Sequence, residues 1–399
     1  MTVAELFIKY LKQLGVRHVF SIPGAALEPL YKAVHKSNQG ETEDGKLRII
    51  LTKHEQGAAF MADGYARVGG KLGVCWGTTG PGSTNLITGI ASSFADSIPV
   101  LVMTAQVSTS SFGKGALQES TAHGVNIVDL FRYFTKSSAM VINPEKAGDM
   151  FRQTLRHALS GRRGPAHLNI PVDLMEKEAG GKSHPAVSFQ PQSKSFDREA
   201  LETAAELLRN ARNPAMLLGN GTLLSGAAAE AAGLTGILPL PVATTPKAKG
   251  AFPEDHPLSL GVFGLAGSPR ASDYLLNSGA SASKVDVLLA VGTSFNEWGT
   301  YAWDDRLSPG KALIQVDIDP YEFGKNYLFE VGLAGDAKAI LQALALELRN
   351  QLNLLPKKER DAFEKKKSRH RGGRGISHER NGDSHRGQLQ KAGGLDSGK

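Results

Sequence analysis

The sequence contains almost no cysteine. Cys75 is the single cysteine among 399 residues, so the chain cannot form an internal disulfide and a disulfide-stapled fold is excluded. Long apolar runs are also missing, since no stretch approaches the about 18 consecutive apolar residues that a membrane-spanning helix needs. The first residues carry an acid, Glu5, and no basic segment, so we expect no signal peptide and a cytoplasmic protein.

Excess charge is missing from most of the chain. The last 44 residues hold 13 Lys and Arg against 6 Asp and Glu, which accounts for the whole net charge of +7. Residues 1–355 are therefore neutral, and nucleic acid is not expected as their partner. The basic tail, 356–399, is the one part with a composition suited to a polyanion. We interpret it as disordered from residue 368, and its abrupt start also fits an out-of-frame sequence.

What the sequence does contain is a regular alternation of short apolar strands and amphipathic helices. In the first half, strands are expected at 19–22, 48–51, 72–76, 100–104 and 166–170, and helices at 3–14, 54–68 and 145–159. In the second half, strands are expected at 215–218, 285–291 and 312–318, and helices at 197–210, 225–233 and 336–354. Apolar strands separated by helices predict a parallel sheet covered on both faces.

A polar stretch with several Pro and Gly residues, 176–196, divides the two halves and indicates a linker. The sequence therefore predicts an α/β protein with two doubly wound parallel-sheet domains in tandem and a disordered basic tail. The expected boundaries are 1–185 for the first domain, 186–355 for the second and 356–399 for the tail.

Two strand-to-helix junctions carry residues suited to holding a ligand. Glu55 begins the helix expected after the strand at 48–51, and small residues follow it. The loop Gly77–Asn85 joins the next strand to a helix, and its glycines would let backbone approach a ligand beside free N–H groups. Each feature alone has an ordinary structural explanation: a helix-start acid favoured by the helix dipole, and a tight turn.

Together with further segments, these junctions resemble the thiamine-diphosphate (ThDP) enzymes, most closely the acetolactate synthase large-subunit group. The matching segments are 53–67, 77–85, 97–106, 117–119, 161–165, 286–297 and 314–320. They occur in order over about residues 1–355. The resemblance implies decarboxylation of pyruvate and transfer of the two-carbon unit to a second 2-keto acid, in branched-chain amino-acid biosynthesis. It also implies ThDP with Mg²⁺ as cofactor, and a homodimer or higher assembly.

The resemblance assigns roles to residues of the first domain. In the family a glutamate hydrogen-bonds the aminopyrimidine ring of ThDP, and Glu55 matches it. Gln118 matches an active-site glutamine near the substrate, but Leu117 stands where the family usually has Phe, which leaves the second substrate open. The segment that lines the pyrimidine pocket is matched by Gly80, Pro81, Gly82 and Asn85.

The second domain resembles the family's central domain, which in acetolactate synthase holds an FAD without a redox role. Arg162 matches an arginine associated with that FAD, although the next residue, proline in the family, is Arg163 here. Asp317 and Asp319 follow a strand, where acids commonly meet ribose hydroxyls. The turn 293–297 departs from the family's pattern. The sequence is therefore compatible with a second domain that binds FAD and with one that does not.

A third family domain, which carries a Gly-Asp-Gly motif for Mg²⁺ and the diphosphate, has no match after residue 330. The 11 histidines also show no metal-ligand spacing, so we expect no metal site in this sequence. We therefore expect a truncated or frameshifted enzyme that is inactive alone. The alternatives are another ThDP-dependent 2-keto-acid decarboxylase or lyase, a non-catalytic remnant, and a nucleic-acid binder that acts through its tail.

Overall fold

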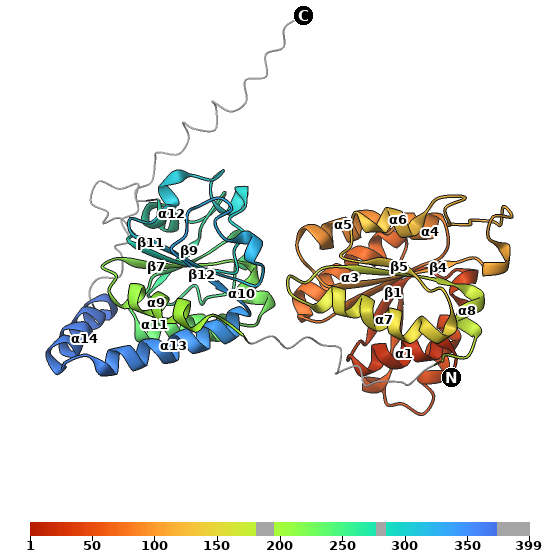
Figure 1. Cartoon of the computed structure of the whole chain (residues 1–399), viewed down its shortest axis with the longest axis horizontal. Helices are drawn as coiled ribbons and strands as arrows, with labels where there is room; N and C mark the ends of the chain where they lie inside the picture. The colour runs from red at the N-terminus through yellow and green to blue at the C-terminus, as the bar shows by residue number, and fades with distance from the viewer. Residues whose placement is uncertain (181–194, 277–284, 373–399) are drawn as a thin grey trace, which may run out of the picture. The chain divides into compact units, whose positions relative to one another are not determined.

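The computed structural model describes residues 1–180, 195–276 and 285–372. The chain divides into two compact units, Met1–Lys194 and Ser195–Lys399 (Figure 1). Each unit is an α/β structure built on one six-stranded parallel sheet, which confirms the expected fold class. Within the described part of the chain, no helix has the length and apolar character needed to cross a membrane.

The first unit has the strand order β2-β1-β3-β4-β6-β5. Its strands are β1 (His18–Ser21), β2 (Arg48–Leu51), β3 (Gly73–Gly77), β4 (Val100–Gln106), β5 (Ser138–Met140) and β6 (Ala166–Pro171). Every residue of β3, β4 and β6 is buried, as expected for parallel strands covered on both faces. The order reverses beside β1, because β2 lies on one side of it and β3 on the other.

Helices cover both faces of this sheet. They are α1 (Val3–Gln13), α2 (Glu28–Ser37), α3 (Glu55–Gly69), α4 (Pro81–Thr84), α5 (Ile87–Ala95), α6 (Ile127–Arg132), α7 (Pro144–Leu159) and α8 (Val172–Glu176). In Figure 1, α1, α7 and α8 lie on one face and α3, α5 and α6 on the other. On the first face Phe7 of α1 stacks on Phe151 of α7, with ring centroids 4.6 Å apart.

Contact between α3 and α5 depends on small residues. A Cβ added to Gly89 of α5 would lie 2.5 Å from the Cβ of Ala59 in α3, so the two helices approach closely only because position 89 has no side chain. Local signals set the helix ends: Thr2 and Glu5 form a capping box at the start of α1, and α3 ends at Gly70 with φ +62°.

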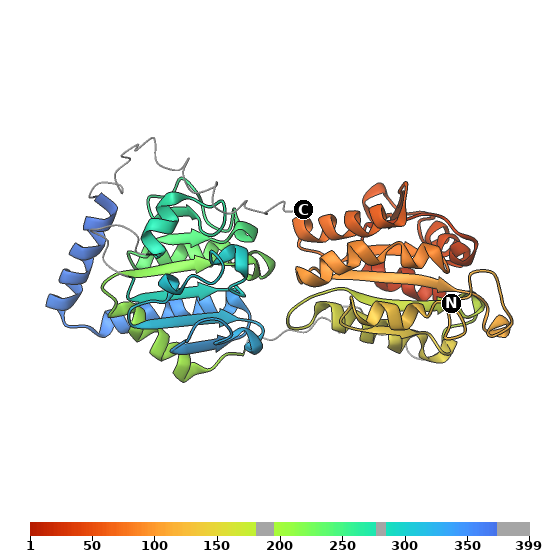
Figure 2. The ribbon, with the colours of Figure 1, turned by 90° about the horizontal axis from the view of Figure 1, so that it is seen from above.

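The second unit has the strand order β12-β11-β10-β7-β8-β9. Its strands are β7 (Pro214–Leu218), β8 (Val242–Thr244), β9 (Ser259–Val262), β10 (Val287–Val291), β11 (Ala312–Asp317) and β12 (Val331–Ala334). Its helices are α9 (Arg198–Arg209), α10 (Asn220–Leu224), α11 (Ala228–Ile237), α12 (Pro269–Leu275), α13 (Ala337–Leu354) and α14 (Lys357–Gly372). Here the order reverses between β7 and β10, and Figure 2 shows α14 in blue after α13.

Some details differ from the sequence-based expectation. The helix expected at 225–233 is α11 (Ala228–Ile237), which begins later because Gly226 has φ +66° and separates it from the short helix α10. Helix α14 runs to Gly372 and so includes 368–372, the first residues of the tail expected to be disordered. The rest of the predicted disordered tail, 373–399, and most of the predicted linker, 181–194, lie outside the described residues.

A fully buried histidine joins three strands of the first unit. The ring Nε2 of His167 lies 2.7 Å from Thr104 Oγ1, and Nδ1 lies 2.8 Å from Ser138 Oγ. Ser138 Oγ donates to the carbonyl of Val128 at 2.6 Å, so it accepts a hydrogen bond from Nδ1–H, and Nε2 then accepts one from the hydroxyl of Thr104. Burial lowers the pKa of His167 from 6.5 to about 3, because the charged ring would lose its hydration.

This histidine should make the stability of the chain depend on pH. The unfolded chain gains a proton at position 167 as the pH falls below 6.5, whereas the folded chain stays neutral there until about pH 3. The contribution of the neutral His167 ring to the free energy of unfolding is therefore complete above pH 6.5. Below pH 6.5 this contribution falls by about 1.4 kcal/mol per pH unit. We expect His167→Leu to reduce this slope in urea unfolding between pH 7.5 and 4.5. The exposed His157→Gln should keep the full slope, and an unchanged slope in His167→Leu would contradict the assignment.

Candidate functional site

Glu55 lies where the chain leaves β2 and enters α3. His54 is the N-cap residue, and its Nδ1 accepts a hydrogen bond from the backbone N–H of Gln56 at 3.1 Å. The carboxylate of Glu55 accepts a hydrogen bond from Nδ2 of Asn85, with Oε2 3.0 Å from the nitrogen. Glu55 is only partly exposed, so this bond fixes one of its oxygens in a half-buried position.

The glycine loop after β3 lies directly against that carboxylate. A Cβ added to Gly82 would lie 2.6 Å from Thr78 Cγ2 and 3.3 Å from Glu55 Oε1. Gly80 has φ +57°, a conformation that favours glycine, and it leads into Pro81 at the start of α4. The loop thus presents bare backbone at Gly82 beside Glu55, a close approach that a side chain at position 82 would disturb.

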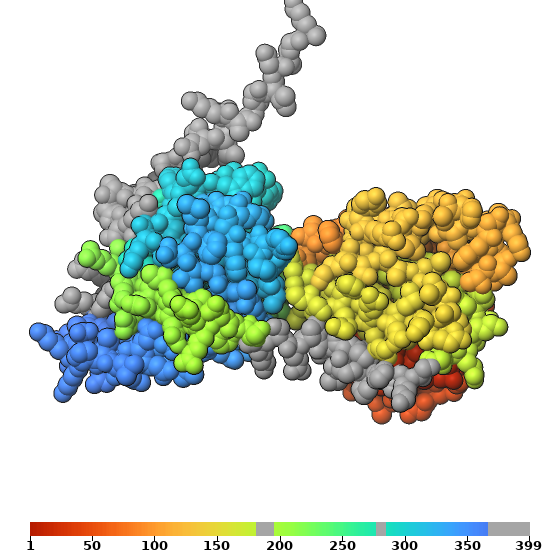
Figure 3. Space-filling view, viewed as in Figure 1, coloured from red at the N-terminus to blue at the C-terminus, as the bar shows by residue number. Residues whose placement is uncertain are grey.

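Gln118 comes to the same place from the segment after β4. Its backbone has φ +61°, and its side-chain Oε1 accepts a hydrogen bond from Thr79 Oγ1 at 3.0 Å. A Cβ added to Gly80 would lie 3.0 Å from the Cβ of Gln118. In the space-filling view, orange segments of the chain lie at the surface of the first unit (Figure 3).

The structure therefore brings together most of the residues that the sequence assigned to the cofactor. Glu55, Gly80, Gly82, Asn85 and Gln118 all follow the carboxyl ends of β2, β3 and β4, beside the point where the strand order reverses. This is the usual ligand position in an open parallel sheet. Pro81 is exposed and shapes the turn into α4.

The cluster fits one end of ThDP. A fixed carboxylate and flanking bare backbone suit the edge of an aminopyrimidine ring, whose nitrogens and amino group both donate and accept hydrogen bonds. Among the residues that the structure describes, no group of three or more His, Cys, Asp or Glu could hold a metal ion. These residues therefore fit the ring of ThDP, whereas the described residues contain no cluster of three or more His, Cys, Asp or Glu that could bind Mg²⁺ beside a diphosphate.

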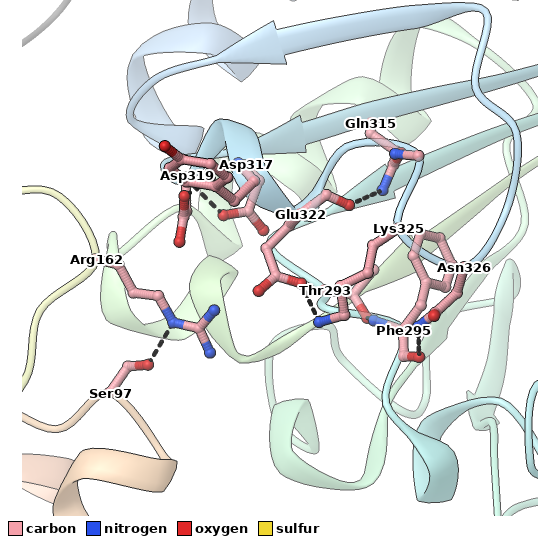
Figure 4. A network of polar contacts seen from close by, with 12 residues as sticks. Ser97, Arg162, Thr293, Phe295, Gln315, Asp317, Asp319, Glu322, Lys325 and Asn326 are labelled. Carbon is pink, nitrogen blue, oxygen red and sulfur yellow. Dashed lines mark hydrogen bonds and ion pairs between the residues drawn. The ribbon is translucent and has the colours of Figure 1, made fainter. Parts of the chain in front are cut away.

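Arg162 lies at the opposite edge of the same sheet. Its Nε donates to Ser97 Oγ at 2.7 Å, and the two residues precede β6 and β4 respectively (Figure 4). Lys136 holds this turn by donating from Nζ to the carbonyls of Ser160 and Arg162, both at 2.7 Å. Arg162 is exposed and is not part of the Glu55 cluster.

In the second unit, Asp317 and Asp319 lie at the carboxyl end of β11. Asp317 Oδ1 accepts from the backbone N–H of Asp319 at 3.0 Å, and Asp319 Oδ1 accepts from the N–H of Tyr321 at 3.1 Å. Beside them Glu322 pairs with Lys325 at 2.8 Å, as Figure 4 shows. The two aspartates therefore shape the turn after β11.

The loops after β7 and β10 touch through glycines. A Cβ on Gly219 would lie 2.2 Å from the carbonyl oxygen of Gly292. A Cβ on Gly221 would lie 2.7 Å from the Cα of Gly292. Trp298 and Trp303, which follow β10, are largely exposed. The unit therefore has glycine loops at a strand-order reversal and acids after the next strand, which is the usual ligand position in an open parallel sheet.

Comparison with known proteins agrees with this geometry. Residues 1–127 match the model of the thiamine pyrophosphate (that is, ThDP) enzyme N-terminal TPP-binding domain. Residues 201–344 match the model of the central domain of the same enzymes. The chain belongs to the thiamine pyrophosphate enzymes. The two matched regions lie in the first and second structural units respectively.

Curated relatives extend the match along most of the chain. The chain is 38% identical over 363 residues to a probable acetolactate synthase large subunit of Methanocaldococcus jannaschii. The matched residues cover 88% of this chain and 58% of the relative. The chain is 38% identical over 367 residues to the probable large subunit of Methanococcus aeolicus, covering 90% of this chain and 58% of that protein. An acetolactate synthase of Arthrospira platensis is 35% identical over 348 residues, which cover 86% of this chain and 57% of that protein. The chain thus spans little more than half the length of these relatives.

Sequence reasoning missed three residues of the site, Thr79, Gln106 and Ser120. Gln106 ends β4, and its partner Ser120 is 14 residues further along. A signal was present, since β4 carries polar side chains at Thr104 and Gln106 inside an otherwise apolar strand. Polar residues two apart on a buried strand share one face and need partners there.

The glycine loop should tolerate no side chain at position 82. We expect Gly82→Ala to lower the free energy of unfolding by about 1–3 kcal/mol, because the new methyl group must displace Thr78. Gly64→Ala in α3 is the matched control, since a Cβ there meets nothing within 4 Å and should stabilise the helix by about 0.5–1 kcal/mol. Equal effects of the two substitutions in denaturant unfolding would show that the loop does not press against its neighbours.

Proposed function

We propose that the first unit binds the aminopyrimidine ring of ThDP, and that the chain is the corresponding part of an acetolactate synthase-type carboligase. The observation that carries this proposal is the Glu55 carboxylate, fixed by Asn85 and placed against the bare backbone of Gly82. The names of the curated relatives support the reaction class. Pyruvate and a second 2-keto acid are the proposed substrates.

Glu55 has the central chemical role in this proposal. Asn85 engages Oε2 at 3.0 Å, which leaves Oε1, on the side of Gly82, to meet a ring nitrogen and to share a proton with it. ThDP, when bound, supplies the carbon nucleophile and electron sink for decarboxylation of a 2-keto acid. The chain's own contribution is to hold the ring, orient it and set its protonation state.

Gln118 is proposed to act on the substrate side. Thr79 donates to its Oε1, so the amide Nε2 is the group directed to a carboxylate or keto oxygen. Leu117, at 86% exposed, stands beside it in place of the aromatic residue usual in the family. This exposed aliphatic residue supports a second candidate, another ThDP-dependent 2-keto-acid decarboxylase or lyase.

The remaining cofactors are proposed from the chemistry of each unit. Since the described residues show no cluster for Mg²⁺, we infer that the diphosphate is held elsewhere and that this chain alone does not turn over pyruvate. The second unit is proposed to take FAD at its glycine loops, with Asp317 or Asp319 on the ribose. A non-catalytic remnant would keep both binding functions without turnover.

A homodimer is proposed from exposed apolar side chains of the first unit. Leu51, Phe60, Met61 and Phe94 are each exposed by 43% or more, on β2, α3 and α5. Exposed apolar side chains favour association with a second copy. Burial raises the pKa of the Cys75 thiol, and this single unreactive cysteine fits the proposed cytoplasmic location.

Replacement of Glu55 by Gln should weaken binding of the ring. Loss of a charge-assisted hydrogen bond costs about 1.5–3 kcal/mol, so the dissociation constant for thiamine should rise about 10- to 100-fold in calorimetric titration. Glu145→Gln is the matched control, because Glu145 also lies in the first turn of a helix, α7, and is exposed. If both variants bind thiamine as the unsubstituted chain does, Glu55 is a helix-start acid and nothing more.

A further inference from the structure

The side chain of Gln106 ties the end of β4 to the segment that carries Gln118. Its Oε1 accepts two backbone hydrogen bonds, from the N–H of Val107 and from the N–H of Ser120, both at 3.0 Å. Its Nε2 lies 3.4 Å from Oδ1 of Asn169 on the neighbouring strand β6. Gln106 is fully buried, so no solvent competes for these bonds.

Ser120 extends this link to the glycine loop. Its hydroxyl accepts a hydrogen bond from the backbone N–H of Gly80 at 2.8 Å and donates to the carbonyl of Gln118 at 3.0 Å. One buried hydroxyl therefore connects the loop after β3 to the segment after β4. Thr79 adds a third bond, from its hydroxyl to the side-chain Oε1 of Gln118.

The orientation of the Gln106 amide is determined by a series of hydrogen bonds among buried side chains of β4 and β6. Asn169 Nδ2 donates to Thr104 Oγ1 at 2.8 Å, and Thr104 donates to the neutral ring of His167. Since Nδ2 of Asn169 is used in this way, its Oδ1 is left to accept from Gln106 Nε2. Gln106 must then turn Oε1 toward Ser120, so the buried strands determine which end of the amide faces the loops.

These bonds hold Gln118 in an unfavourable backbone conformation. A non-glycine residue at φ +61° is strained and persists only where its surroundings hold it. Here the carbonyl of Gln118 is bound by Ser120 and its side chain by Thr79. Strain that is held by several independent bonds is typical of functional positions.

We propose that Gln106, Ser120 and Thr79 are positioning residues of the cofactor site. They hold Gln118 and Gly80 at a fixed separation, with the Gln118 amide turned so that Nε2 faces the bound ligand. This inference rests on the proposed function of the pocket. None of the three side chains needs to touch the cofactor, since each acts through Gln118 or Gly80.

The test compares Ser120→Ala with Ser120→Thr, which keeps the hydroxyl, and with Ser110→Ala, an exposed serine in the same segment. Amide exchange at Gly80, thiamine affinity and thermal midpoint are measured on the full chain. In Ser120→Ala the Gly80 amide loses its acceptor, so its exchange should accelerate about tenfold or more. Thiamine affinity, measured well below the thermal midpoint of each variant, should fall about tenfold. Ser120→Thr should restore both the exchange rate and the affinity.

Faster exchange at Gly80 with unchanged affinity would overturn the inference, and so would unchanged exchange. Failure of the unsubstituted chain to bind thiamine would instead overturn the proposed function, before any variant is compared. Should Ser120→Ala fail to fold, Thr79→Val replaces it, with Thr79→Ser as the hydroxyl-retaining control. Thr79→Val removes the bond to Gln118 Oε1 and should lower thiamine affinity, whereas Thr79→Ser should not. Equal affinities in those two variants would overturn the inference.

Discussion

The pairing of β1 with β3 determines where everything else in the first unit lies. Since β2 pairs with the other edge of β1, the chain that leaves β2 crosses over β1 to reach β3 through α3, and α3 packs against α5 of the next connection. Glu55, at the start of α3, and the glycine loop after β3 therefore meet at the carboxyl end of the sheet. A ligand site at this edge follows from strand order, before any side chain is considered.

Burial on both faces of the sheet imposes the second constraint. A polar side chain inside such a sheet must be fully paired, because an unpaired buried donor or acceptor costs more free energy than a bond returns. Thr104, Gln106, His167 and Asn169 meet this condition by bonding to one another across β4 and β6. Their network ends at Ser120 and Gly80, so the same bonds that permit polar residues in the core also fix the loops of the site.

Much of this could be predicted from the sequence, because local patterns specify local structure. The first strands and helices follow apolar periodicity, and Glu55 and Gly82 lie at junctions that such patterns reveal. β5 (Ser138–Met140) was missed because its three residues are only half-buried and have no apolar run. The link from Gln106 to Ser120 was missed for another reason, since partners 14 residues apart in an irregular segment leave no periodic signal.

The central claim is that the described residues recognise the aminopyrimidine end of ThDP and not its diphosphate. It is tested most directly by titrating the chain with thiamine and with ThDP, each with and without Mg²⁺. The account predicts dissociation constants for the two ligands within about threefold of each other, and no effect of Mg²⁺, because no described cluster can hold the metal. Binding of ThDP more than about tenfold tighter than thiamine, and dependent on Mg²⁺, would contradict it.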